Sequence, residues 1–212
     1  MTNVQYFDEM NLIQSEKDVR VEMCNTLSGA IKEAIDDENS ENWEKVMRDI
    51  LIAWLLLFGY ITAKQGKAIQ DLTDSGHLFF DTNSKDWYEK TVANSILFDT
   101  ENTLKRTIAD IEKGTSKKNS KSRADVIARD ATNKYSNIYN RKVAKDNGAT
   151  RHKWISMRDK VTRSSHRDAD GQIQPIDIPY NVNGYYMMFP MDDTYGAPAD
   201  EICNCRCTEI FY

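Results

Sequence analysis

The chain has 212 residues, enough for one large domain or two modest ones, with the apolar and charged content of a protein that buries a core. Its formal net charge is −5, but residues 1–112 hold 11 Lys and Arg against 21 Asp and Glu, residues 113–163 hold 15 against 4, and residues 164–212 hold 2 against 8. The negative total therefore does not exclude a protein that binds nucleic acid, because the basic middle section can contact a polyanion. Alternatively, this section complements acidic parts of the same chain or of a neighbouring subunit.

No pattern for export or for a membrane span is present. The first ten residues are polar and acidic, without the basic start and apolar run of a signal peptide. The longest uncharged run that is mainly apolar, residues 50–63, has 14 residues, whereas a bilayer needs about 20. We expect this run to be a buried central helix. The four cysteines are then expected to be free thiols or metal ligands rather than disulfides.

Helices are predicted along the front half of the chain. Apolar residues near helical spacing predict a helix over residues 8–37, and the cluster Asp-Asp-Glu-Asn-Ser ends it. A second helix is predicted from Asn42 through the uncharged run, and two more over residues 85–99 and 101–113. We therefore expect an N-terminal helical bundle over residues 1–113.

A short basic segment follows the predicted bundle. Residues 114–122 are small and polar without an apolar side chain, which is typical of a linker, so the boundary to a second module of residues 123–212 is expected here. Four basic residues are candidates for phosphate contact, although a solvated linker has the same composition: Lys117, Lys118, Lys121 and Arg123. Next, residues 122–147 predict a helix that is closed by Asn-Gly.

The helical spacing of apolar residues ends after Arg151, and strands are predicted in the remainder of the chain. Residues 172–178 alternate around Pro175, which favours an edge strand because proline lacks the N–H that a ladder needs. Further strands are predicted over residues 184–189 and 203–212. The expected fold class is α+β, a helical bundle followed by a small α+β module with a short antiparallel sheet.

Cysteine spacing near the C-terminus indicates a candidate metal site. On a strand, Cys203, Cys205 and Cys207 project to one face, and His166 completes four nitrogen and sulfur donors that suit tetrahedral structural zinc. Cys-x-Cys is a less usual spacing than Cys-x2-Cys. In the alternative interpretation, these are buried apolar cysteines and a hydrogen-bonded histidine. Trp154 is expected in the core, with its indole N–H on a partner.

Eight residues in the second half of the chain stand out together by their order and spacing: Trp154, Asp159, Arg163, His166, Gly171, Cys205, Arg206 and Cys207. Their pattern resembles that of the phage Mu F-like minor head protein family, also called head-morphogenesis proteins of tailed phages. The resemblance covers about residues 121–208. One departure is Asp130-Ala131, where the family commonly has Thr-Glu.

This resemblance implies a minor capsid protein at the portal vertex inside the head, made in the host cytoplasm and acting in procapsid assembly and in DNA packaging or ejection. The implied partners are the portal protein, a major capsid or scaffolding protein, and packaged double-stranded DNA, with no catalysis expected. The alternative is a zinc-dependent hydrolase or nuclease, or a toxin-like enzyme, that uses His166 and Asp159. Against it, the sequence has no Gly-rich phosphate loop and no His-Glu-x-x-His.

Overall fold

The computed structural model describes residues 2–8, 14–36, 52–53, 93–115, 120–146 and 148–212. Within these residues the chain has the predicted α+β composition, with helices first and a small antiparallel sheet after them. The helix predicted from Asn42 lies outside the described residues, apart from 52–53, which are helical. No helix of the described part is long and apolar enough to cross a bilayer.

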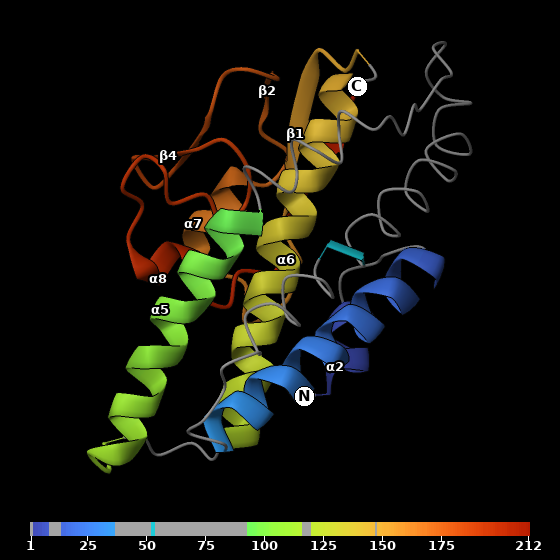
Figure 1. Cartoon of the computed structure of the whole chain (residues 1–212). Coiled ribbons are helices and arrows are strands. Elements are labelled where there is room, and N and C mark those ends of the chain that lie inside the picture. The colour runs from blue at the N-terminus through green and yellow to red at the C-terminus, as the bar shows by residue number, and fades with distance from the viewer. Residues whose placement is uncertain (1, 9–13, 37–51, 54–92, 116–119, 147) are drawn as a thin grey trace.

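Four helices make up the described front half and the middle of the chain: α1 (Asn3–Asp8), α2 (Gln14–Asp36), α5 (Ala93–Glu112) and α6 (Ser120–Asp146). Two of them agree with the sequence, because α2 lies inside the helix predicted over residues 8–37 and α6 matches the one predicted to end at 147. In Figure 1, α6 runs through the middle of the molecule with α2 and α5 beside it.

The predicted break between helices over residues 85–99 and 101–113 is wrong, because α5 is continuous through this boundary. Residues 85–92 of the first predicted helix lie outside the described residues. Asp99, Thr100 and Glu101 include neither glycine nor proline, so nothing in the backbone interrupts the helical hydrogen bonds. Thr103 supports the continuity by donating its hydroxyl to the carbonyl of Asp99 at 2.8 Å.

A first core forms where α6 packs against α1 and α2. Apolar residues of α6 recur three or four positions apart and therefore share one face of the helix. They meet side chains of α1 and α2 that are almost completely excluded from solvent. The main members of this core are Phe7, Met23, Leu27, Ile31, Ala124, Ala128, Tyr135 and Tyr139.

A second, polar face of α6 is equally buried. Its side chains include Asn133, Ser136 and Asn137, and the two asparagines contact the segment that leads to the C-terminus. The helix therefore packs on the N-terminal helices with one face and on the C-terminal module with the other. The boundary predicted at 114–122 overlaps the start of this shared helix, since residues 120–122 already belong to α6.

The sheet is built around β1 (Arg151–Ile155), which is the middle strand between β2 (Ile173–Pro175) and β5 (Thr208–Phe211). Both pairings are antiparallel. The edge position predicted for the strand that contains Pro175 is confirmed, because β2 pairs on one side only within this sheet. The central strand β1 was not predicted.

A hairpin and two short helices complete the module. Strands β3 (Tyr180–Val182) and β4 (Tyr185–Met187) are joined by Asn183-Gly184, whose φ values of 55° and 84° match the turn that a two-residue hairpin favours. Strand β4 is therefore shorter than the strand predicted over residues 184–189. The helices are α7 (Ser164–Ala169) and α8 (Ala199–Ile202).

The strand predicted over residues 203–212 is wrong in its first half. Cys203 is the C-terminal cap of α8, and Asn204 has a left-handed backbone with φ of 56°, so extended structure begins only at Thr208. The chain thus turns between Cys203 and Cys205, and the three cysteines do not project from one strand face.

Candidate metal centre

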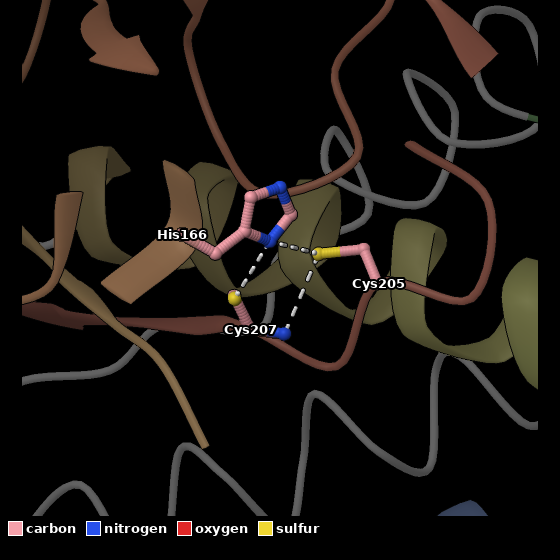
Figure 2. A group of neighbouring side chains, drawn as sticks. All are labelled: His166, Cys205 and Cys207. Carbon is pink, nitrogen blue, oxygen red and sulfur yellow. Dashed lines mark hydrogen bonds between the residues drawn. The ribbon is translucent and has the colours of Figure 1, made fainter. Parts of the chain in front are cut away.

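A histidine and two cysteines meet in a second buried core, which lies in the C-terminal module and includes Trp154, Tyr180 and Met187. His166 projects from α7, and Cys205 and Cys207 lie between α8 and β5. The side chains come together with His166 Nδ1 3.3 Å from Cys207 Sγ and 3.6 Å from Cys205 Sγ. All three residues are at most 2% exposed. Figure 2 shows both sulfur atoms on the Nδ1 side of the imidazole ring.

The opposite nitrogen of the ring faces a carboxylate. His166 Nε2 lies 3.2 Å from Glu201 Oε2, within ion-pair distance although outside hydrogen-bond geometry. Glu201 belongs to α8 and is held in place by Ser165 Oγ at 2.7 Å and by Asn183 Nδ2 at 3.0 Å. The carboxylate is therefore fixed by α7 and by the hairpin turn, and it restricts the orientation of the ring.

Electrostatics in this group favour one thiolate. Burial opposes ionisation of Cys205, but hydrogen bonds from Cys207 and His166 outweigh it, so the pKa of Cys205 is lowered. The pKa of Cys207 is raised well above its usual value, first by the hydrogen bond with Cys205 and then by burial. Burial also opposes the charged form of His166, but the hydrogen bond and charge of Cys205 raise its pKa. Within this group, ionisation is therefore favoured at Cys205 over Cys207.

Backbone carbonyl groups of the cysteine segment are anchored from two helices. Asn133 Nδ2 donates to the carbonyls of Cys205 at 2.9 Å and Cys207 at 3.3 Å, and Asn137 Nδ2 donates to that of Cys207 at 3.2 Å. Tyr6 of α1 donates its hydroxyl to the carbonyl of Cys205 at 3.2 Å. The front helices thus hold the segment that carries both sulfur atoms.

The structure brings together three of the four predicted donors. Cys203 is exposed, and its sulfur is not part of the group formed by His166, Cys205 and Cys207. Its carbonyl instead accepts a hydrogen bond from the guanidinium of Arg163. The physical reason is the end of α8, which places Cys203 on the outer side of the turn.

Other positions of the motif build the surroundings. Asp159 pairs with Arg206 at 2.5 Å and accepts a hydrogen bond from Thr162 Oγ1 at 2.7 Å. Gly171, with φ of 81°, takes the turn that precedes β2.

Trp154 is completely buried, as predicted, and it lies edge-on to the ring of His166, with ring centres 5.5 Å apart. The predicted partner for its indole N–H is not present as a hydrogen bond among the described residues. The interaction of Trp154 with Cys207 lowers the pKa of this thiol, but the larger effects of Cys205 and of burial outweigh it.

The candidate phosphate contacts are described in part. Lys117 and Lys118 lie outside the described residues. Lys121 is exposed at the start of α6, and Arg123 is half-buried and donates from Nε to Thr107 Oγ1 at 3.3 Å. Arg123 therefore also holds α5 against α6.

Sequence reasoning missed a second buried polar cluster, at the other end of β1. His152 Nδ1 lies 2.7 Å from Glu209 Oε1 and 2.9 Å from Arg141 Nη1, and Tyr180 donates its hydroxyl to Glu209 Oε1 at 3.0 Å. The guanidinium of Arg141 also donates to the carbonyl of Ile176. The sequence does contain one signal for this cluster. Side chains alternate between the two faces of a strand, so His152 lies on the same face of β1 as the buried Trp154.

Comparison with known proteins gives one family match. The model of the family described as Phage Mu protein F like protein matches residues 90–210, more than half of the chain. The matched region begins next to α5 and includes the whole group of His166, Cys205 and Cys207. Neither a curated protein nor a solved structure gives a match.

Proposed function

Because the chain belongs to the Phage Mu protein F like family, we propose that it is a minor head protein of a tailed phage that acts in head morphogenesis. The observation that carries this proposal is the family match over residues 90–210, which spans α5, α6 and the elements of the sheet module. In the finer form of the proposal, the protein acts from the portal vertex inside the capsid, during procapsid assembly and DNA packaging or ejection.

The charge distribution supports two kinds of partner. Residues 1–112 are strongly acidic and suit a protein surface of opposite charge, such as one on the portal protein or on a major capsid or scaffolding protein. Residues 113–163 are strongly basic and suit the phosphate backbone of packaged double-stranded DNA. We propose that the protein is located in the virion after synthesis in the host cytoplasm.

The proposed role is architectural rather than enzymatic. In the enzymatic alternative, His166 and Asp159 form the acid–base pair. Asp159 is instead engaged with Arg206 and Thr162, and His166 faces the two cysteines and Glu201. These different engagements favour a role for both residues in holding the module together.

Co-expression with the portal protein of the same phage tests the location. A complex should co-purify at moderate salt, and procapsids assembled with the protein should contain it in fewer copies than the major capsid protein. Co-expression with the major capsid protein alone serves as the comparison. Failure to bind the portal protein together with absence from procapsids would contradict the proposal.

Titration with duplex DNA of unrelated sequences tests the nucleic-acid contact. Each lysine that meets a phosphate adds about 0.9 to the slope of log affinity against log salt, so Lys117→Ser, Lys118→Ser, Lys121→Ser should flatten that slope. Arg123 is kept in this variant because it also contacts Thr107. The control, Lys17→Ser, Lys32→Ser, Lys105→Ser, removes the same charge from the acidic part of the chain. Equal effects of the two variants would assign the basic segment to protein contacts.

A further inference from the structure

We propose that His166 Nδ1, Cys205 Sγ and Cys207 Sγ bind one zinc ion, with Glu201 as the carboxylate that orients the histidine from its other ring nitrogen. This site is independent of the proposed role in the phage head. It rests on the separations between the three donor atoms, the number of groups at Nδ1, and the surroundings of the ring.

The separations between the ring nitrogen and the two sulfur atoms are those of a tetrahedral site. Zinc binds sulfur at about 2.3 Å and nitrogen at about 2.0 Å, so a nitrogen and a sulfur on one tetrahedral ion lie about 3.5 Å apart. His166 Nδ1 lies 3.3 Å from one sulfur and 3.6 Å from the other. All three donor atoms lie within 4.8 Å of one another. A metal ion therefore fits between them with little movement of the side chains.

Two sulfur atoms at one ring nitrogen are poorly explained by hydrogen bonds alone. Nδ1 of imidazole has a single in-plane position, which is either one N–H donor or one lone pair. It can therefore form one good hydrogen bond, whereas both Cys205 and Cys207 lie close to it. An ion between the three atoms uses the lone pair of Nδ1 and a lone pair of each thiolate at once.

The surroundings of the ring also match a metal-binding histidine. Such a histidine usually gives its second N–H to a carboxylate, which fixes the tautomer that leaves the other nitrogen free for the metal. Glu201 Oε2 lies 3.2 Å from Nε2 and is itself held by Ser165 and Asn183. On the sulfur side, the backbone N–H of Cys207 points to Cys205 Sγ at 3.5 Å, as expected around a thiolate.

The donor set identifies the class of ion. Two thiolates and an imidazole favour zinc and other soft or borderline metals over magnesium and calcium, which prefer oxygen ligands. Three donors from the described chain leave one tetrahedral position for a small ligand such as water. The ion would join α7 to the segment between α8 and β5, where the local structure consists of short elements.

Metal analysis of the full-length protein, purified without a metal-affinity tag and under reducing conditions, tests this site. About one zinc per chain is expected, and replacement by Co²⁺ should give a thiolate-to-cobalt charge-transfer band together with the intense visible bands of tetrahedral cobalt. The Cys205→Ser, Cys207→Ser variant should lose both the zinc and the spectrum. The matched control, Cys203→Ser, removes the exposed neighbouring thiol and should keep both.

A third variant tests the orienting carboxylate. Glu201→Gln should weaken zinc binding by about 10- to 100-fold in a chelator competition while the cobalt spectrum keeps its form. Unaltered affinity in this variant would remove Glu201 from the proposal. Wild-type protein that contains no zinc and shows no thiolate band with Co²⁺ would overturn the site, whether or not the double variant folds. Loss of metal in Cys203→Ser would overturn the three-donor set.

Discussion

At the scale of single residues, Asp170 illustrates how one carboxylate holds the turn after α7. Its two oxygens accept the backbone N–H of Ser156 at 2.8 Å and Nε of Arg158 at 2.6 Å. Burial alone would raise the pKa of Asp170, but these two donors outweigh it, and the pKa is lowered. The ionised form is therefore the one that stabilises the fold.

The pKa shift of Asp170 predicts a stability difference that depends on pH. Because the pKa is lower in the folded chain than in the unfolded chain, where it is about 3.9, the unfolded state binds more protons between the two values. The stabilisation is then complete above about pH 5 and is lost as the pH falls through the folded pKa. Asp170→Asn should lower the free energy of unfolding by about 1.5–3 kcal/mol at neutral pH, and this deficit should shrink on acidification.

Urea unfolding of both proteins from about pH 7 down to about pH 3 measures this difference. Asp168→Asn, which changes an exposed residue of α7, is the control and should have a small effect throughout. A deficit of the same size at every pH would show that Asp170 acts through shape or packing rather than through its charge.

Residue types predicted part of the candidate centre. His166, Cys205 and Cys207 were identified because few side chains bind soft metals, and the structure places their donor atoms together. Neither the exclusion of Cys203 nor the place of Glu201 followed from the sequence, because both depend on where α8 ends and how the chain turns at Asn204. The zinc itself stays a prediction.

At the scale of elements, α6 carries a row of two buried amides, Asn133 and Asn137, that bind the backbone of the cysteine segment. Asn137 donates from Nδ2 to the carbonyls of Cys207 at 3.2 Å and Pro190 at 3.3 Å, and its Oδ1 accepts from Thr208 Oγ1 at 3.2 Å. One side chain thus satisfies three groups of the C-terminal module. A polar group that is buried without a hydrogen-bond partner lowers the stability of the folded protein.

Asn137→Ala should therefore lower the free energy of unfolding by about 1–3 kcal/mol, because it leaves buried carbonyl groups with fewer donors. Asn140→Ala is the matched control on the same helix, since the buried Oδ1 of Asn140 has no hydrogen-bond partner among the described residues. Chemical unfolding of the two variants provides the measurement. Equal losses would mean that the row acts by filling space rather than by hydrogen bonding.

Elements with strong local signals were predictable, and those that depend on partners were not. The helical periodicity of α6 and the proline of β2 gave correct predictions. The strand β1, Arg-His-Lys-Trp-Ile, was missed because three of its five residues are polar or charged types that usually lie outside a sheet core. His152 is buried there because Arg141 and Glu209 supply its partners from α6 and β5.

At the scale of the whole molecule, the shared helix changes what a cut in the basic segment should do. The composition of residues 114–122 predicts that a protease cuts there first. The fragments should nevertheless stay together, because α2 and α6 pack in one core and Tyr6 contacts the carbonyl of Cys205.

Limited proteolysis followed by size-exclusion chromatography measures this outcome. A denaturing gel should show two pieces that elute as one species under native conditions, and they should separate only in denaturant. Elution of the pieces as two species would show that the parts before and after the cut are independent domains. A first cut elsewhere would contradict the predicted exposure of residues 114–122.

The position of β1 also has a consequence for the order of events during protein synthesis. Its partner β5 and the two buried cysteines are translated long after β1. The pairing of β1 with β5 therefore cannot form until they have been synthesised. Among the described residues, the fully buried members of the core of α1, α2 and α6 end at Tyr139, and only the partly buried Val143 and Met157 of this core follow, so it can assemble while translation continues. The amide row of α6 can then be in place before the sheet module exists. The sheet module can pack against it only after residues 205–211 have left the exit tunnel of the ribosome.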